Sequence, residues 1–159
     1  MKTMIFCDGA CRGNPGPSSS GVVIFEENKK IFFSGEYEEK GTNNTAELKA
    51  LYHALLLSKN YDDVVIKTDS QYSINCLTKW AYSWKAKDWK KANGPIKNLE
   101  LIKIIHSLWL ELKDNVEIVY VKGHAGIIGN ELADDAANYG LDHKIKKLQN
   151  IINIFRLLN

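Results

Sequence analysis

The sequence predicts an α/β domain in which a five-stranded mixed sheet is flanked by helices. Short apolar runs, typical of strands, alternate with longer stretches whose apolar residues recur every three or four positions. Of the 159 residues, 45% are hydrophobic and 25% are charged, as in an average globular domain. A chain of this length can bury roughly two thirds of its unfolded surface, so a core needs neither disulfides nor structural zinc.

Three strand-like segments come first. Residues 4–7 form a short apolar run that ends at Asp8, and a loop rich in turn-forming residues follows at 13–17. Residues 21–25 and 30–37 are also strand-like. The polar residues between these two segments predict an antiparallel hairpin or meander.

Helices and strands then alternate along the rest of the chain. Apolar residues at helical spacing predict the helices, and short apolar runs predict the strands. The expected order is helix, strand, helix, helix, strand, helix, over residues 44–58, 64–66, 72–84, 98–112, 116–121 and 130–139. Helices beside both parallel and antiparallel strands predict a mixed sheet covered by helices.

Cysteine usage and hydropathy predict a cytoplasmic protein. Cys7, Cys11 and Cys76 form no CxxC pair, and their odd number argues against a disulfide framework or a zinc ribbon. No run approaches the ~18 apolar residues of a membrane span. The N-terminus reaches Asp8 too early for a signal peptide.

One segment is strongly basic although the formal net charge of the whole chain is only +2. Residues 79–97, here called the basic segment, contain six lysines and one acid, Asp88. Such clustering favours contact with a polyanion, whereas an even scatter would only keep the protein in solution.

Four acids stand at the ends of predicted elements: Asp8, Glu47, Asp69 and Asp134. Each has an ordinary structural explanation. Asp8 suits a turn, Glu47 completes a capping box with Asn44, Asp69 suits a helix N-cap, and Asp134 suits the first turn of the last helix.

The combination of the four acids indicates more than capping. Strand ends and the starts of the following helices meet at one edge of an α/β sheet, where ligands usually bind. Four carboxylates there would repel one another and raise each other's pKa, whereas two divalent cations would neutralise them. Without a His or Cys ligand cluster, such a site favours Mg²⁺ or Mn²⁺ over zinc. Two ions ~4 Å apart suit in-line displacement at phosphorus.

Five motifs occur in order between about residues 3 and 140. They are DGACRGNPGP at 8–17, TNNTAEL at 42–48, TDSQY at 68–72, VKGHAG at 121–126 and NELAD at 130–134. The ordered set resembles type 1 ribonuclease H of the bacterial kind, and it is far more specific than any single motif. The resemblance implies a ribonuclease H-like fold.

The resemblance implies an endonuclease that hydrolyses the RNA strand of RNA–DNA hybrids with two Mg²⁺ ions, leaving 5′-phosphate and 3′-hydroxyl ends. Mn²⁺ is expected to substitute, and primer and R-loop removal are the implied roles. By position, Asp8 and Asp69 would contact both metals, Glu47 would complete one site and Asp134 the other. His124, in a glycine-flanked loop, would assist proton transfer or product release; a solvated loop histidine is the alternative.

Substrate contacts are also implied by position. A protein distinguishes RNA from DNA through the 2′-hydroxyl, which lies in the shallow minor groove. The family positions that face this groove are occupied here by Cys11, Asn14, Asn44 and Gln71. Thr42 and Asn43 match the neighbourhood of a pocket for a DNA-strand phosphate. Turn formation or helix capping is the alternative role of these small polar residues.

Part of the basic segment resembles the protruding basic handle with which some members hold the DNA strand. Lysines supply phosphate contacts that do not depend on sequence, and an aromatic ring can lie against a sugar or base. The contacts are expected from Lys85, Lys87, Trp89, Lys90 and Lys91. Trp80 and Trp84 share the helical stripe of Leu77 and are expected in the core.

Residues 1–140 are expected to form the catalytic domain, because the resemblance covers about residues 3–140. Residues 141–159 are expected to form a helical tail with an apolar stripe made of Ile145, Leu148, Ile152 and Phe155. Because apolar stripes usually pack on their own chain, docking on the domain is favoured over a surface for a partner or for self-association.

Two other functions stay open. A binding module for hybrids or single strands could keep the fold without catalysis, but it would be expected to lose at least one of the four acids. A ribonuclease H domain from a reverse-transcriptase polyprotein is the second alternative. The expected partner is an RNA–DNA hybrid, with no membrane, no obligate protein partner and a monomeric state.

Overall fold

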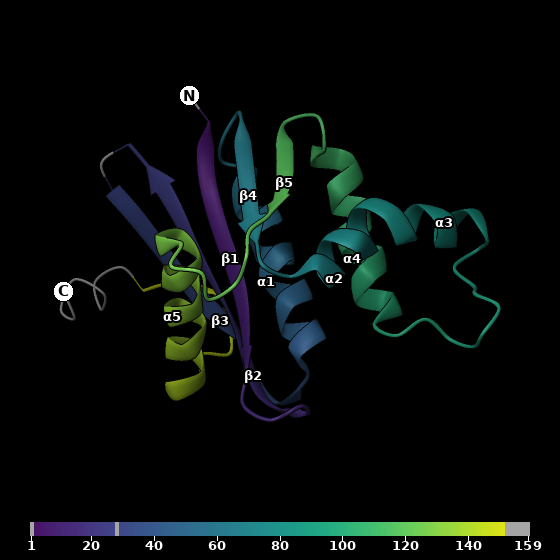
Figure 1. The fold of residues 1–159 in the computed structure, drawn as a ribbon, viewed down its shortest axis with the longest axis horizontal. Helices are drawn as coiled ribbons and strands as arrows, with labels where there is room; N and C mark the ends of the chain where they lie inside the picture. Colours follow the sequence, from purple (N-terminus) through teal and green to yellow (C-terminus); the bar gives the residue numbers. More distant parts are fainter. Residues whose placement is uncertain (1, 28, 152–159) are drawn as a thin grey trace.

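A computed structural model describes residues 2–27 and 29–151, and its strands form one sheet with helices on both faces (Figure 1). The elements in chain order are β1 (Thr3–Cys11), β2 (Gly16–Glu26), β3 (Lys29–Gly41), α1 (Asn43–Ser58), β4 (Val64–Thr68), α2 (Gln71–Asn75), the π-helix η1 (Cys76–Trp80), α3 (Ala81–Ala86), α4 (Leu99–Leu112), β5 (Val116–Tyr120), α5 (Ile128–Asp142) and β6 (Gln149–Asn150).

The strand order is β5-β4-β1-β2-β3-β6. β1 pairs antiparallel with β2 and parallel with β4, so the predicted mixed sheet is confirmed. The sheet has six strands in the described part of the chain, one more than predicted. The additional strand, β6, has only two residues and is too short to show a periodic pattern.

Alternate residues of the central strands face two separate apolar clusters. Ile5 and Val22 pack in the larger cluster with the buried residues of α1 and α4. Phe6 and Val23 pack in the other cluster with Ala133 of α5. This alternation places α1 and α5 on opposite faces of the sheet, as a strand's two-residue period requires.

The predicted helix over residues 72–84 is interrupted. α2 ends at Asn75, and η1 continues to Trp80 with a backbone bond from the N–H of Ala81 to the carbonyl of Cys76. A bond between residues five apart widens the helix by one residue per turn. Figure 1 shows α3 and the chain that follows it reaching away from the sheet, on the side opposite the C-terminus.

The predicted helical tail is not observed where the tail is described. After α5 the chain turns, with the N–H of Ile145 bonded to the carbonyl of Gly140, and then pairs with β3 through β6. Ile145 and Ile151 are buried in the cluster of α5. Because β3 offers an unpaired strand edge, backbone pairing replaces the expected helix. Ile152 and Phe155 lie outside the described residues.

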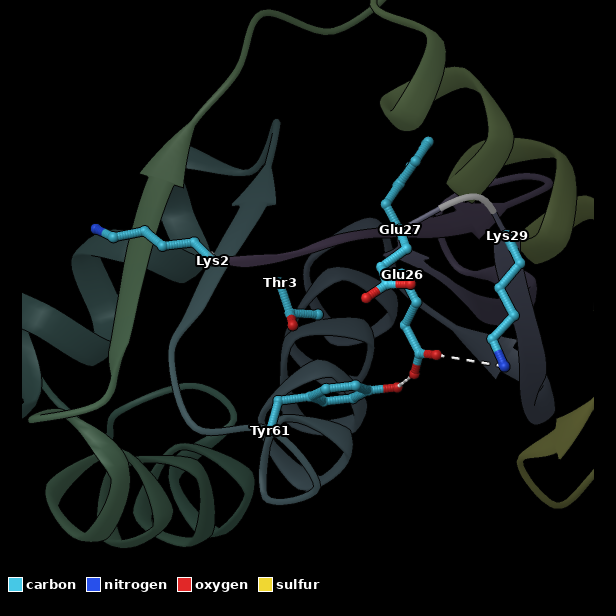
Figure 2. A pocket seen from close by; sticks show the side chains of 7 residues that line it. Lys2, Thr3, Glu26, Glu27, Lys29 and Tyr61 are labelled. Atoms are coloured by element: carbon cyan, nitrogen blue, oxygen red, sulfur yellow. Dashed lines mark hydrogen bonds and ion pairs between the residues drawn. The ribbon is translucent and has the colours of Figure 1, made fainter.

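A hollow of about 620 Å³ lies where β1 begins and β2 ends (Figure 2). Three of its side chains interact with one another. The Tyr61 hydroxyl donates to Glu26, and the Lys29 ammonium lies 3.4 Å from the same carboxylate. In the part of the chain that the structure describes, no helix has the length and apolar character needed to cross a membrane.

Candidate active site

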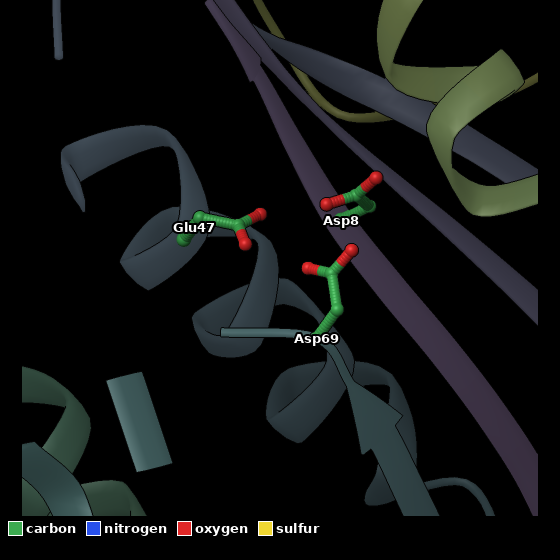
Figure 3. A group of neighbouring side chains, drawn as sticks. All are labelled: Asp8, Glu47 and Asp69. Atoms are coloured by element: carbon green, nitrogen blue, oxygen red, sulfur yellow. The ribbon is translucent and has the colours of Figure 1, made fainter. Parts of the chain in front are cut away.

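Three of the four predicted acids meet at the other end of the sheet (Figure 3). Asp8 lies late in β1, Glu47 lies in α1, and Asp69 directly follows β4. One carboxylate oxygen from each lies within 4.8 Å of the others. The three side chains come from separate elements and point toward one another.

Close packing of α1 against β1 brings Glu47 to Asp8. The N–H of Gly9 donates to a Glu47 oxygen and also to Asp8 Oδ1, the latter at 3.0 Å. A Cβ at Gly9 would lie 2.4 Å from the backbone carbon of Ala46, so only glycine permits this approach.

The structure removes the ordinary explanations for the acids in helices. Thr42 is the N-cap of α1 and forms a capping box with Thr45, so the predicted pairing of Asn44 with Glu47 is wrong. No acid lies in the first turn of α1, and the Glu47 side chain is therefore available to the site. Thr42 and Asn44 are both residues that cap helices, and sequence spacing alone could not decide between them.

The ordinary explanations of Asp69 as a helix cap and of Asp134 as a first-turn acid are also wrong. Ser70, not Asp69, caps α2. α5 starts at Ile128, two residues before its predicted start, so its first-turn acid is Glu131 and Asp134 lies one turn later. The half-buried Asp134 accepts a 3.2 Å hydrogen bond from Asn138 Nδ2.

Burial and mutual repulsion dominate the electrostatics of the acids. Burial raises the pKa of Asp8, and the charges of Asp69 and Asp134 raise it further. Burial also raises the pKa of Glu47 well above its usual range, with Asp8 and Asp69 adding to the effect. Asp134 thus lies close enough to act on Asp8, although it lies outside the group of three. The ionised cluster is unfavourable unless a positive charge joins it.

The residues fit a divalent metal. The converging ligands are carboxylate oxygens, which hard cations prefer, and a cation would relieve the repulsion that raises the pKa of Asp8 and Glu47. Asp8, Glu47 and Asp69 could hold such an ion together, and Asp134 could complete a neighbouring site.

Asn130 is a site residue that the sequence analysis overlooked. It is 4% exposed, and its Nδ2 donates to Asp69 Oδ2 at 3.2 Å. Its Oδ1 is buried without a hydrogen-bond partner among the described residues. Asn130 stands in the NELAD motif, but its contact with Asp69 spans 61 residues of chain and has no local signal.

The loop that carries His124 lies against Asp69. A Cβ at Gly123 would lie 2.6 Å from Asp69 Oδ2, so the loop backbone closely approaches this carboxylate. His124 itself is exposed, with a φ of 52°. The loop therefore presents an exposed imidazole beside the acidic group, where it is accessible to a substrate.

Several predicted substrate residues line one open hollow of about 520 Å³. The lining consists of Asn14, Thr42, Asn43, Asn44, Lys97 and Asn98. Asn14 Oδ1 accepts the N–H of Asn43 at 3.0 Å, which joins the first loop to the start of α1. Two predicted residues lie elsewhere: Cys11 is half-buried with Sγ 2.7 Å from the Gly13 carbonyl, and the exposed Gln71 bonds Asn75.

The three tryptophans of the basic segment are buried to different degrees. Trp84 is half-buried and packs against the core, as expected, whereas Trp80 is 39% exposed. Trp80 and Trp84 line a second hollow together with Tyr72 and Lys91. Trp89, expected to contact the substrate, is half-buried against the core with Lys103 over its ring. The π-helix changes the helical phase after Asn75, so the stripe predicted for one regular helix misplaces Trp80. The predicted lysines 85, 87, 90 and 91 are exposed.

Comparison with protein families and with known proteins gives concordant results. The model of the family RNase H matches residues 1–142. The chain is 44% identical over 140 residues to Ribonuclease H of Methylobacillus flagellatus, covering 87% of this chain and 90% of that protein. It is 39% identical over 151 residues to Ribonuclease HI of Haemophilus ducreyi, covering 90% and 93%.

Solved structures show the same architecture. LC9-RNase H1, a type 1 RNase H with the type 2 active-site motif, matches with a TM-score of 0.77 at 25% identity, covering 93% of this chain and 76% of that one. LC11-RNase H1 in complex with an RNA/DNA hybrid matches with a TM-score of 0.61 at 28% identity, covering 88% and 99%. With the family match over residues 1–142 and the acids gathered at the sheet's end, the chain belongs to the ribonuclease H family.

Proposed function

We propose that this protein hydrolyses the RNA strand of RNA–DNA hybrids at the acidic group, using two divalent metal ions. The convergence of Asp8, Glu47 and Asp69 within 4.8 Å is the observation that carries the proposal. The relative LC11-RNase H1, whose structure contains an RNA/DNA hybrid, supports the choice of substrate. The products would carry 5′-phosphate and 3′-hydroxyl ends.

Asp8 and Asp69 would contact both ions, with Glu47 completing one site and Asp134 the other. Two bound Mg²⁺ ions would lower the pKa of the attacking water and stabilise the leaving oxygen. Gly9 and Asn130 hold the carboxylates through hydrogen bonds to Glu47 and Asp69. Oxygen ligands and the need for bound waters favour Mg²⁺, with Mn²⁺ able to substitute.

His124 would assist proton transfer or product release. Its exposure and the contact of its loop with Asp69 support this role, since the imidazole is free to meet the departing strand. An imidazole can both donate and accept a proton near neutral pH.

The substrate would lie across the face between the acidic group and the basic segment. Cys11, Asn14, Asn44 and Gln71 would read the minor groove, and Thr42 and Asn43 would hold a phosphate of the DNA strand. The lining of one hollow by Asn14, Thr42, Asn43 and Asn44 supports a shared ligand. We place the catalytic domain at residues 1–140, with residues 141–159 as a segment docked on it.

The basic segment would hold the DNA strand through Lys85, Lys87, Trp89, Lys90 and Lys91. All four of these lysines are exposed. Replacing Lys87, Lys90 and Lys91 with alanine is expected to raise KM for a hybrid and flatten its salt dependence while kcat stays within about twofold. A matched control replaces Lys2, Lys59 and Lys113, which lie toward the other end of the sheet. An unchanged salt slope in the first variant contradicts this role.

The central experiment follows cleavage of one end-labelled RNA strand presented in an RNA–DNA hybrid, in duplex RNA and alone. Mg²⁺, Mn²⁺ and EDTA are compared, with Asp69→Asn beside wild type. Asp62→Asn, at an exposed aspartate before β4, is the matched control. We expect cleavage of the hybrid alone, dependent on metal, abolished by Asp69→Asn and unaffected by Asp62→Asn. Binding of hybrid without cleavage in either metal would instead indicate a non-catalytic binding module.

A further inference from the structure

His106 is a buried histidine that the proposed reaction does not use. It lies in α4 and is 1% exposed. Its neighbours in the helix, Ile102 and Ile105, belong to the main core. The side chain is therefore anchored in the body of the protein, and what it contacts is held in place relative to the sheet.

The imidazole contacts η1 through a backbone carbonyl. His106 Nδ1 lies 3.2 Å from the carbonyl oxygen of Leu77. Since a carbonyl only accepts, Nδ1 donates this hydrogen bond. Nε2 is buried without a hydrogen-bond partner among the described residues.

The same ring contacts two aromatic side chains, Tyr82 and Trp89, which precede and follow Lys85 and Lys87 in the chain. Tyr82 of α3 meets it edge to face, with centroids 4.7 Å apart and an interplanar angle of 87°. Trp89, which follows α3, lies 6.0 Å away at 77°. Lys85 and Lys87 stand between these two contacts in the chain, and Lys90 and Lys91 directly follow the second, so the imidazole holds the backbone on both sides of the first two lysines and next to the other two.

We infer that His106 is a positioning residue for substrate binding: through the Leu77 carbonyl and the Tyr82 and Trp89 rings, it orients the lysines of the basic segment toward the DNA strand. This inference rests on the proposed role of that segment. The contacts come from η1, α3 and the following loop, which succeed one another in the chain. α3 and the loop after it reach away from the sheet (Figure 1). Without them, the lysines would keep their charge but lose their fixed arrangement.

The test uses the full chain with His106→Phe and His106→Asn. Phenylalanine keeps an aromatic ring and removes the donor to Leu77, whereas asparagine keeps a donor at the position of Nδ1 and removes the ring. His53→Asn is the matched control because His53 is also buried, at 4% exposure, but bonds Ser20 and Glu36 away from the basic segment. For each variant, kcat, KM for a hybrid, Tm and amide hydrogen exchange over residues 81–91 are measured.

For both His106 variants we expect KM to rise about fivefold, kcat to stay within about twofold, and exchange over residues 81–91 to accelerate. Combining His106→Phe with alanine at Lys87, Lys90 and Lys91 should raise KM by less than the product of the separate effects, because both changes remove the same contacts. The control should lower Tm without changing KM.

Three results would overturn the inference. If the His106 variants lose Tm as the control does while KM stays at the wild-type value, His106 is only a core residue. A fall in kcat at constant KM would place its effect at the acidic group instead. If the triple lysine variant leaves KM unchanged, the proposed role of the basic segment fails and this inference fails with it. If the triple lysine variant raises KM but the His106 variants do not, only the inference about His106 fails.

Discussion

Glu47 combines a proposed catalytic role with an energetic cost. Burial and the carboxylates of Asp8 and Asp69 raise its pKa, so the folded protein without metal binds a proton there more tightly than the unfolded chain does. A raised carboxyl pKa lowers stability progressively as the pH rises above the unfolded value. The cost can be tolerated because an ionised Glu47 is what a metal ion requires.

Glu47→Gln is expected to abolish cleavage and to raise Tm in EDTA by about 3 °C at pH 8. The amide carries no charge, still accepts the N–H of Gly9, and can donate to a neighbouring carboxylate. Thermal unfolding followed by circular dichroism with and without Mg²⁺ measures both effects. A Tm of Glu47→Gln below that of wild type in EDTA would show that the Glu47 side chain stabilises the fold by more than its charge repulsion destabilises it.

A buried row of polar side chains, Ser20, His53 and Glu36, links β2, α1 and β3. Ser20 Oγ lies 2.9 Å from His53 Nδ1, and His53 Nε2 lies 3.1 Å from Glu36 Oε2. The hydrogen bond from His53 lowers the pKa of Glu36. Since Ser20 and His53 are both under 5% exposed, no substrate reaches them, and the chain of contacts ties α1 to β2 and β3.

Glu36→Gln is expected to lower stability at pH 7 by about 1 kcal/mol, a value reduced because the carboxylate is partly solvated. A lowered carboxyl pKa stabilises the fold above the unfolded value and ceases to do so as the pH falls through the folded value. The difference from wild type should therefore vanish in acid. Urea unfolding at pH 7, 5 and 3.5 tests this, with Glu39→Gln on the same strand as the control. A difference that persists unchanged at pH 3.5 contradicts the assignment.

The packing of α5 depends on a glycine in β2. A Cβ at Gly21 would lie 2.3 Å from the carbonyl oxygen of Ala133 and from the backbone nitrogen of Ala137. These are backbone atoms of a helix and cannot rotate away. The close approach sets the distance of α5 from the sheet, and with it the position of Asp134 near Asp8.

Gly21→Ala is expected to lower stability by about 2 kcal/mol and to reduce kcat about tenfold or more, because α5 must move outward and carries Asp134 with it. Urea unfolding and steady-state cleavage of a hybrid measure the two effects. An unchanged kcat in a destabilised variant would contradict the dependence of Asp134's position on the close packing of α5 against Gly21.

The protruding region shows how a local irregularity can hide from sequence patterns. Residues 72–84 have the period of one helix, but η1 adds a residue to one turn and changes which rings face outward. Trp80 is exposed for this reason. Helical spacing therefore predicted the presence of a helix here but not the environment of its aromatic residues.

The body of the protein extends past the family match at residue 142. Ile151 is 2% exposed, and its N–H bonds the carbonyl of Phe32 on β3. Residues 145–151 therefore pair with β3 and contribute to the core beneath α5.

Ile151→Ala is expected to lower stability by about 3 kcal/mol through lost burial and a residual cavity, while kcat and KM stay near wild type at a temperature where the variant is folded. Urea unfolding compared with hybrid cleavage tests this, with Ile104→Ala, at an exposed isoleucine of α4, as the control. An effect no larger than that of Ile104→Ala would mean that the tail does not stabilise the domain.

The sequence predicted most of the elements, the mixed sheet and the three acids that converge, because hydrophobic periodicity and short motifs are properties of neighbouring residues. Packing decided which caps form, where the tail pairs, and which groups surround the carboxylates. Gly9 bonds Glu47 across 38 residues, and Asn130 bonds Asp69 across 61. The repulsion among the carboxylates and the contacts of Tyr82 and Trp89 with His106 also join residues that are distant in the chain. No local pattern encodes such contacts.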